Sequence, residues 1–330
     1  MRLAVIALVL FSAGCGRYAE FTLPPPQAGP EPHYRWEVRA QPVLERGATG
    51  EWDASDVLNP SVMRLADKLL NLYSGFDGHA WHTGLAESAD GITWTRRGKV
   101  LSPDPATWEG KYIAANGSAL IVGGEILYWY QAGNPPRIGL AGSPNATKWT
   151  KEPKPVLDVG PVGSWDERGI GDPYVIRADD SLYLFYTGID RASRQRLGVA
   201  RSSDGGKTWT KLRSNPIFDI GPDLAFDENG LGEPAVWTAG GSWWMLYTGR
   251  DRHEFRRIGL AQSKDGIHWK RSSDVPVFAG DQPWNDKVVC DPTVEVTPGA
   301  IRVWFGGGNV ASPDERLNGA IGYAELKPAQ

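Results

Sequence analysis

Short hydrophobic segments separated by turn residues repeat along nearly the whole chain, and they are of four kinds that return in the same order. One kind follows a polar residue and a proline, as at Tyr174–Ile176. Another ends in an aromatic residue, any residue and glycine, as at Tyr186–Gly188. A third reads Leu-Gly-Val-Ala at residues 197–200, and the fourth begins at a tryptophan such as Trp209. Segments rich in β-branched and aromatic residues between turn residues are typical of strands.

A polar residue stands just before the first segment of each repeat. In Trp165–Pro173, an aromatic residue precedes an aspartate by seven positions, and a proline follows. The matching polar residues of the five repeats are Asn59, Asn116, Asp172, Glu233 and Asp291, which are 57, 56, 61 and 58 residues apart. A fixed period of this size indicates a repeat architecture. We therefore predict that these five residues surround one pocket.

Four strands per repeat and five repeats predict an all-β fold, a five-bladed β-propeller. The fifth repeat ends after its third strand, near Leu326. Residues Trp36–Leu44 match the fourth-strand segment Trp149–Leu157. We predict that this N-terminal strand completes the last blade and leaves no open edge. Read alone, Val62–Leu72 fits an amphipathic helix, but the repeat predicts a hairpin that turns at residues 66–68.

A turn of the form Ser-x-Asp-Gly precedes the fourth strand, as at Ser88–Trp94. A longer version at Ser202–Trp209 resembles the Asp-box of sialidases, which is a structural turn there too. An Asp side chain can accept hydrogen bonds from backbone N–H groups, glycine can adopt positive φ, and the Trp can pack between blades. We therefore expect these sites to be structural.

The composition agrees with one large all-β domain, which we place at residues 34–330. The 330 residues include 15 Trp, 40 Gly and 25 Pro, as many short strands joined by Gly- and Pro-rich turns would require. The formal net charge of -4 provides no basic surface for nucleic acid. We expect a monomer with no nucleic-acid partner.

The N-terminus carries features of an exported protein. The apolar run Leu3–Phe11 is too short to span a bilayer and fits the core of a signal peptide. Residues 12–15 resemble a bacterial lipoprotein signal in which Cys15 is lipidated, although a serine stands where leucine is usual. We expect a signal peptide over 1–15, a Pro-rich spacer over 16–33 and a lipid anchor in the cell envelope. Ordinary cleavage and a retained anchor are the alternatives.

Loops between the second and third strands, and between one repeat and the next, should share the face on which the first strands begin. Aromatic rings beside a few polar groups suit a carbohydrate, because sugar CH faces stack on rings and hydroxyls bond to carboxylates and amides. The expected sugar-binding residues are Trp52, Trp165, Arg191, Arg252, Asn59 and Asn116. The alternative for the tryptophans is core packing between blades.

The sequence gives little indication of a metal site. His79 and His82 are expected to be surface loop residues rather than metal ligands, and no other His or Cys cluster forms a recognisable metal set. Lipidation of Cys15 would leave Cys290 without an intrachain disulfide partner. The motifs require no cofactor, and a calcium ion or a water cluster in the central channel is left open.

Asp172, Glu233 and Asp291 occupy equivalent positions in three consecutive repeats. Facing a common channel, their charges would interact and raise at least one pKa. A protonated carboxylic acid beside an ionised carboxylate is what glycoside hydrolysis requires. The alternative is that an acid or amide before proline is a turn device at the start of a strand.

With these residues the chain resembles the five-bladed propeller glycoside hydrolases of families 32, 43 and 68 and the related mannoside phosphorylases, over residues 36–326. The resemblance rests on the five-fold repeat, on Gly-Asp-Pro at 171–173 and on Gly-Glu-Pro at 232–234. It implies that Glu233 is the general acid and that Asp172 assists the transition state or tunes the acid.

The first repeat departs from these families. They carry an aspartate there as nucleophile or base, and the matching residue is Asn59, whose amide cannot take either role. Asp53, Asp56 and Asp291 are the candidates to replace it, and Asp291 is the proposed catalytic base. A separation of about 5 Å between the two carboxylates would favour retention, and about 6.5–9.5 Å would favour inversion.

The leading hypothesis is an exported, lipid-anchored propeller that acts on glycosidic bonds of oligo- or polysaccharides, as a hydrolase or a phosphorylase. Its partners would be a carbohydrate ligand and, through the N-terminal lipid, a membrane. One alternative is a non-catalytic glycan-binding lipoprotein that kept the pocket, which Asn59 favours. Another is a structural or protein-interaction propeller, which the three neighbouring acids disfavour.

Overall fold

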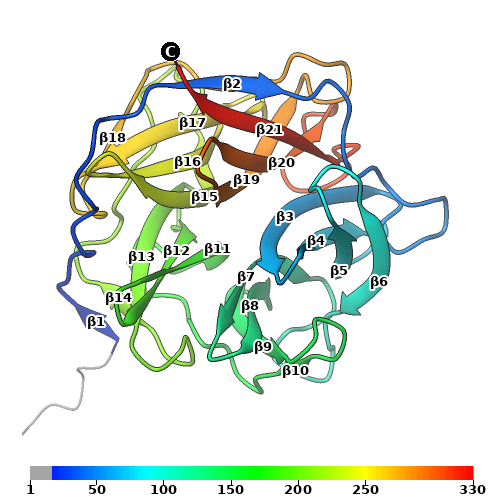
Figure 1. The fold of residues 1–330 in the computed structure, drawn as a ribbon. Helices are drawn as coiled ribbons and strands as arrows, with labels where there is room; N and C mark the ends of the chain where they lie inside the picture. The colour runs from blue at the N-terminus through cyan, green and yellow to red at the C-terminus, as the bar shows by residue number, and fades with distance from the viewer. Residues whose placement is uncertain (1–16, 330) are drawn as a thin grey trace, which may run out of the picture.

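The computed structural model describes residues 17–329, and in this range the chain forms strands and no α-helix (Figure 1). None of the described residues therefore lies in a helix long and apolar enough to cross a membrane. The predicted all-β class is confirmed. Cys15 and the predicted signal peptide lie outside the described residues.

Apart from β1 (Tyr18–Ala19), the strands of residues 17–329 pair in antiparallel groups of four, one group for each repeat. The first two groups are β3 (Asp56–Leu65), β4 (Lys68–Phe76), β5 (Trp81–Ser88) and β6 (Thr95–Leu101), then β7 (Ala114–Val122), β8 (Glu125–Ala132), β9 (Arg137–Ser143) and β10 (Thr150–Lys151). The next two are β11 (Gly169–Ala178), β12 (Ser181–Ile189), β13 (Gln195–Ser202) and β14 (Thr210–Leu212), then β15 (Gly230–Ala239), β16 (Ser242–Arg250), β17 (Arg256–Ser263) and β18 (Trp269–Arg271). The last is β19 (Val288–Val296), β20 (Ile301–Gly308), β21 (Ala320–Pro328) and β2 (Tyr34–Val38).

The hairpin predicted in the first group is present. β3 pairs with β4, with Leu65 opposite Lys68, and Ala66 in the turn has a φ of 54°. Leu69 and Leu70 are both buried although they point to opposite faces of β4. Strands covered on both faces have continuous hydrophobic runs rather than alternation. This explains why the segment alone has a pattern that fits a helix.

The N-terminal strand pairs with the last repeat, as predicted. β2 runs antiparallel to β21 with Trp36 opposite Leu326, and Leu44 forms a further bridge to Ile321. Figure 1 shows β2, in blue, beside β21, in red. A segment from the N-terminal part of the described chain therefore pairs with the last strand of the fold.

Figure 1 shows the groups arranged around a common centre, with β3, β7, β11, β15 and β19 nearest to it. Each of these first strands contacts the first strand of the next group, and β19 contacts β3. The residues just before and within the first strands therefore meet at the centre of the molecule.

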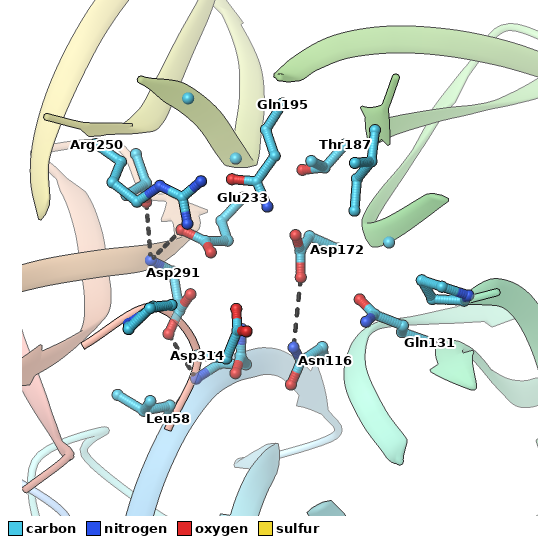
Figure 2. Close-up of a pocket in the computed structure, with 18 of the residues that line it drawn as sticks. Leu58, Asn116, Gln131, Asp172, Thr187, Gln195, Glu233, Arg250, Asp291 and Asp314 are labelled. Carbon is cyan, nitrogen blue, oxygen red and sulfur yellow. Dashed lines mark hydrogen bonds between the residues drawn. The ribbon is translucent and has the colours of Figure 1, made fainter. Parts of the chain in front are cut away.

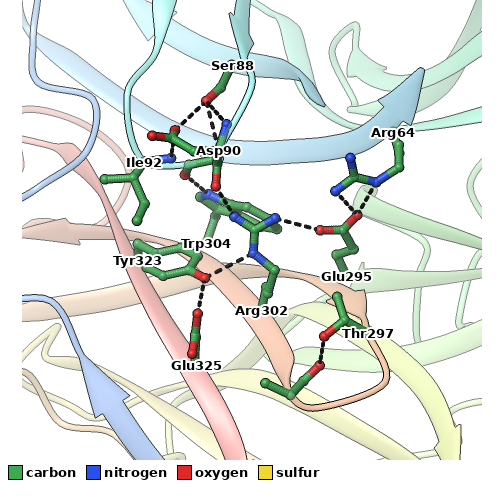
Figure 3. Close-up of polar contacts among 12 residues, drawn as sticks. Arg64, Ser88, Asp90, Ile92, Glu295, Thr297, Arg302, Trp304, Tyr323 and Glu325 are labelled. Carbon is green, nitrogen blue, oxygen red and sulfur yellow. Dashed lines mark hydrogen bonds and ion pairs between the residues drawn. The ribbon is translucent and has the colours of Figure 1, made fainter. Parts of the chain in front are cut away.

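A polar network joins the first and last groups (Figure 3). Arg302 of β20 donates to Glu295 of β19 at 2.9 Å and to the Tyr323 hydroxyl of β21 at 3.0 Å. It also donates to the backbone oxygen of Asp90, in the turn between β5 and β6. Glu295 accepts in addition from Arg64 of β3 at 2.8 Å, across 231 positions of sequence. The network holds the start and the end of the fold together.

The Ser-x-Asp-Gly turns are structural, as predicted. Asp90 accepts hydrogen bonds from the N–H groups of Thr93 and Ile92, both at 2.8 Å, and these bonds hold its pKa at about 2. Trp94 at the end of this turn packs against Trp304 of the last group, with ring centroids 6.4 Å apart.

The Pro-rich segment does not form the predicted spacer over residues 17–33. β1 (Tyr18–Ala19) pairs in parallel with β14, and Phe21 and Leu23 are buried with core residues of the third and fourth groups. The N–H of Leu23 donates to the backbone oxygen of Asp265 at 3.1 Å. Proline fixes an extended backbone but does not determine where that backbone lies. Burial of the two apolar side chains holds the segment on the sheets.

Candidate active site

The five polar residues of the repeats share one backbone conformation. The φ angles are 47° for Asn59, 51° for Asn116, 47° for Asp172, 50° for Glu233 and 52° for Asp291. In each first strand the pairing register shifts at this position, where an extra residue forms a bulge. Bulges re-aim side chains. Here they bring all five to one cavity, and Figure 2 labels four of them.

The cavity has a volume of about 240 Å³ and lies where the first strands meet. It is lined by the five repeat residues together with other polar and aromatic side chains from several groups. The additional side chains include Trp81, Tyr112, Gln131, Gln195, Arg250, Arg256 and Asp314. Figure 2 shows carboxylates, amides and a guanidinium around a common space. Such a lining suits a polar ligand with many hydroxyl groups.

In the aromatic-x-Gly motif, the hydroxyl group of the middle residue binds the backbone N–H of the polar cavity residue in a neighbouring group. The Asn116 N–H donates to Ser74 Oγ at 2.9 Å, and the Asp291 N–H donates to Thr248 Oγ1 at 3.2 Å. The Asn116 amide then donates to Asp172 Oδ1 at 3.4 Å. The middle residue of the motif therefore helps to fix the positions of the cavity side chains.

In the last group that middle residue is Gly306, which has no hydroxyl. Instead Asp291 Oδ2 accepts from the Asn59 N–H and from the Cys290 thiol, each at 3.1 Å. A Cβ on residue 306 would come within 2.7 Å of this oxygen, so glycine leaves the space that the carboxylate needs. Asp291 is only 5% exposed. One of the three acids is thus part of the scaffold of the site.

Burial and mutual charge raise the pKa values of two cavity acids. Burial first, and then the charge of Glu233, raise the pKa of Asp172 to about 7. The same two causes raise the pKa of Asp291 well above its usual range. Because the carboxylates interact, their protons belong to the set rather than to single residues. At neutral pH the cavity therefore holds carboxylic acid and carboxylate side by side.

Two arginines face these acids. Arg256 is 8% exposed; burial lowers its pKa, but the acidic groups around it raise it by more, so that it lies above its usual range. Its guanidinium donates to the backbone oxygen of Ser312 at 3.2 Å. Arg250 also lines the cavity and pairs with Glu254 at 3.4 Å. The arginines offset the negative charge that the carboxylates bring together.

The sequence model of the glycosyl hydrolases family 32 N-terminal domain matches residues 71–282, more than half of the chain. The chain belongs to this family. The resemblance drawn from the repeat and from the acid-Pro motifs is therefore confirmed.

This family 32 chain is similar both to curated sequences and to solved structures. The uncharacterised protein MT1551 of Mycobacterium tuberculosis is 29% identical over 165 residues, which are 46% of this chain and 52% of that protein. The chain thus spans about half the length of the curated relatives it matches. A glycosyl hydrolase from Bacteroides ovatus superposes with a TM-score of 0.72 and 17% identity, covering 91% of this chain and 96% of its own.

A structure from glycoside hydrolase family 130 gives a similar result. That family is described as mannoside phosphorylases with hydrolases that target β-1,2 mannosidic linkages in Candida mannan. The TM-score is 0.68 at 18% identity, over 91% of this chain and 95% of that chain. Likeness at these identities shows the fold, which is the propeller type of the glycoside hydrolases.

Two aromatic residues predicted to bind sugar lie outside the cavity of this family 32 chain. The ring of Trp52 lies against Gly75, and that of Trp165 against Gly188, so close that a Cβ on either glycine would collide with it. These glycines end the second segments of their repeats. Core packing, the alternative for the tryptophans, is therefore their role, and it explains the aromatic-x-Gly motif.

The predicted arginines also lie away from the cavity. Arg191 pairs with Glu167 at 2.9 Å, and Arg252 pairs with Glu228. Their side chains are 70% and 52% exposed. Each partner glutamate lies two residues after the aromatic residue of its repeat. These ion pairs hold the two arginine side chains at the surface, away from the cavity.

The upstream acids considered as replacements for the missing aspartate are structural. Asp53 is buried and accepts from the Tyr73 hydroxyl at 2.9 Å. In the third group, Asp166 likewise pairs with the buried Lys211. The acid that follows the aromatic residue of the repeat thus anchors strands within its group. Asp56 is also buried and does not line the cavity.

Two observations concern metal binding. His82 is buried rather than at the surface, with its ring nitrogens 3.1 Å from the Asp77 carboxylate and 3.0 Å from a serine hydroxyl. Donor atoms of Glu233, Cys290 and Asp291 lie within 4.8 Å of one another and are the group that could hold a metal ion among the described residues. A buried guanidinium already supplies positive charge beside them.

Several cavity residues were not predicted from the sequence. Gln195 and Arg256 begin the third strands of their groups, and Arg250 ends a second strand opposite Arg256. Polar residues at matching positions of two repeats were the available signal. Asp314 gave no such signal, because its loop between β20 and β21 has no counterpart of similar sequence in the other repeats.

Proposed function

We propose that this protein is an enzyme that cleaves glycosidic bonds by carboxylate acid–base chemistry. The observation that carries the proposal is the meeting of Asp172, Glu233 and Asp291 in one cavity, where burial and mutual charge keep protons on the set at neutral pH. Membership of family 32 supports the same chemistry.

The proposed roles follow from position. Glu233 gives a proton to the glycosidic oxygen as the bond to the anomeric carbon breaks. Asp172 tunes this acid and stabilises the positive charge that develops on the sugar. Asp291 accepts a hydrogen bond from the Asn59 N–H and so fixes the backbone of that residue. Asn59 and Asn116 bond to sugar hydroxyls from the other side of the cavity.

The proposed architecture is a closed propeller of five blades with the catalytic cavity on its axis. The ring of contacts from β3 through β7, β11, β15 and β19 back to β3 supports this geometry. The pairing of β2 with β21 supports completion of the last blade by the N-terminal strand. A closed ring keeps the carboxylates of neighbouring blades at fixed separations, as catalysis requires.

A glycan-binding protein without turnover is the second candidate, and one residue favours it. Asn59 stands where related hydrolases carry an aspartate, and an amide neither accepts a proton from water nor attacks carbon. The cavity would then bind a sugar through the same amides and carboxylates. The substrates to test include fructosides and arabinosides, which the resemblance to the propeller glycoside hydrolases suggests, and β-1,2-linked mannosides, which hydrolases in the family of the structural relative target.

The test is a screen for reducing-sugar release from fructans, arabinans, xylans and mannans, without and with phosphate. The wild-type protein is compared with Glu233→Gln, and we expect the variant to lose about 100-fold or more in kcat. Wild-type and variant proteins with equal turnover would contradict the role of Glu233. Binding to one glycan by calorimetry without turnover would establish the second candidate.

We also propose export with a lipid on Cys15, a residue outside the described part of the chain. The apolar run before it and the spacing of small residues support the proposal. Expression with its signal in a bacterial host should place the protein in the membrane fraction. Cys15→Ala should leave it out of that fraction, and an unchanged distribution would refute the lipid anchor.

A further inference from the structure

The cavity lacks an evident carboxylate to act opposite the general acid. Asn59 cannot do so, and Asp291 is poorly suited because it is 5% exposed and one of its oxygens accepts two hydrogen bonds. Its carboxylate also lies within 4.8 Å of Glu233, which is closer than an acid and a base that must hold both a water and the anomeric carbon between them. Inverting enzymes place these groups about 6.5–9.5 Å apart.

One further carboxylate reaches the same cavity. Asp314 lies in the loop between β20 and β21, is exposed, and lines the cavity together with Asp172 and Glu233. Figure 2 shows it on the Leu58 side of the cavity, with Gln195 on the far side. Leu58 is the residue before Asn59. Asp314 therefore lines the same cavity as Asn59, the residue that stands where related hydrolases carry their aspartate.

The loop that carries Asp314 is fixed at several points. Arg256 donates to the backbone oxygens of Ser312 and Pro313, the two residues before it. The hydroxyl of Tyr112 donates to the carboxylate of Glu315, the residue after it, at 2.8 Å. The loop of the last group is therefore held by a residue of the fourth group and by a residue that precedes the second group.

Asp56 of β3 also holds the loop that carries Asp314. Its carboxylate accepts from the N–H of Arg316 at 2.5 Å and from that of Gly319 at 2.8 Å. Leu317 between them is fully buried. Asp56, a candidate replacement base by its sequence position, thus acts by positioning the loop that carries another acid.

We propose that Asp314 is the general base of this enzyme, replacing the carboxylate that Asn59 lacks. The inference rests on the proposed glycosidase function of the same cavity. Three observations carry it: the shared cavity, the exposure of Asp314, and the fixed loop.

The reaction forms one bond, breaks one bond and moves two protons. The oxygen of a water molecule forms a bond to the anomeric carbon while the bond from that carbon to the glycosidic oxygen breaks. Glu233 gives its proton to the departing oxygen, and Asp314 takes a proton from the attacking water. Proton exchange with solvent then restores both side chains, and the product sugar has inverted configuration.

The experiment uses the full-length protein and the aryl glycoside that the wild type cleaves best among 4-nitrophenyl arabinofuranoside, xyloside and mannoside. Asp314→Asn should lower kcat by about 100-fold or more with little change in KM. Sodium azide should restore turnover and yield a glycosyl azide, because an anion needs no base to attack. Asp314→Asn/Asn59→Asp, which returns a carboxylate to the first group, should recover part of the activity without azide.

Asp223→Asn is the matched control, since Asp223 is an exposed loop aspartate that does not line the cavity. Wild-type kcat in Asp314→Asn, or azide rescue of Asp291→Asn but not of Asp314→Asn, would overturn the inference and leave the proposed function intact. A 2,4-dinitrophenyl glycoside of the same sugar separates the two roles. Its leaving group needs no proton, so Glu233→Gln should cleave it and Asp314→Asn should not.

Discussion

At the scale of single residues, the site combines constant backbone geometry with variable side-chain chemistry. The five polar residues of the repeats, which line the cavity, all have φ near +50°, a conformation that costs non-glycine residues about 1 kcal/mol or more. Asn59 and Asn116 adopt it as fully as Asp172 does. The strained bulge therefore belongs to the fold, which aims a side chain at the axis from each repeat. Chemistry then depends only on which side chain stands there.

The raised pKa of Asp172 predicts a pH-dependent cost to stability. Its carboxyl titrates near pH 3.8 when unfolded and near pH 7 when folded, so between these values the folded state holds a proton that the unfolded state has lost. Folding stability therefore falls as pH rises through this window. Asp172→Asn should raise Tm above pH 7 by about 2–4 °C or more, with a smaller gain near pH 4.

Thermal unfolding followed by circular dichroism from pH 4 to pH 8 measures this effect. Asp180→Asn, at an exposed position of the turn that follows the same strand, is the control. If Asp172→Asn changed Tm by the same amount at every pH, titration of the Asp172 carboxyl would not be the source of the change.

At the scale of elements, the sequence predicted strands and turns well because each is specified locally and repeated. The hairpin turning at Ala66 and the Asp90 turn are both present. The positions of aromatic residues were harder, since a sugar pocket and a close-packed strand pair both favour Trp. Gly188, which lies against Trp165, was the overlooked signal, because a glycine within a strand often marks a place where another group approaches the backbone closely.

Segments without a repeat could not be predicted in this way. The Pro-rich composition of residues 17–33 indicated an extended chain, but Phe21 and Leu23 decide where that chain packs. Asp314 lies in a loop whose position depends on contacts with Arg256 and Asp56 from other groups. Such contacts join distant parts of the sequence, and no local pattern records them.

The buried ion pair between Lys211 and Asp166 in the third group predicts a large loss of stability when its cation is removed. Lys211 and Asp166 are 4% and 1% exposed and form an ion pair. Lys211→Met would leave a buried carboxylate without its cation, which we expect to lower the free energy of unfolding by about 3–5 kcal/mol. The double variant Lys211→Met/Asp166→Asn should recover most of this loss in urea unfolding.

The exposed pair in the same group provides the comparison. Arg191→Ala removes an ion pair whose arginine is 70% exposed, and we expect a change of about 1 kcal/mol or less. Equal losses for Lys211→Met and Arg191→Ala would mean that burial does not set the strength of these pairs.

At the scale of the whole molecule, the first group of strands contacts the last group, and several links hold the two groups together. These two groups are linked by the chain that runs from β2 to β3, by a hydrogen bond from the Val57 N–H to the backbone oxygen of Gly319 at 3.2 Å, and by side-chain contacts. Trp304 of β20 donates to the backbone oxygen of Gly91 at 2.7 Å, and Arg302 donates to that of Asp90 (Figure 3). The turn of the first group is thus docked on the last group.

This docking predicts a local loss of protection when Arg302 is replaced. Arg302→Met removes the links to Glu295, Tyr323 and the turn at residues 88–94, and it leaves Glu295 with only the exposed Arg64. The free energy of unfolding should fall by about 3 kcal/mol or more, against about 1 kcal/mol or less for Arg64→Met.

Amide hydrogen exchange can distinguish a specific role of Arg302 in linking the first and last groups from a general contribution to stability. If Arg302 holds the first and last groups together, amide exchange in the variant should accelerate both in the turn at residues 88–94 and in β21. At denaturant concentrations below the global transition, β12 in the third group should stay protected. A uniform acceleration over all groups would instead make Arg302 one stabilising residue among many. Because the cavity acids come from separate groups, opening between the first and last groups should also reduce turnover before the protein unfolds.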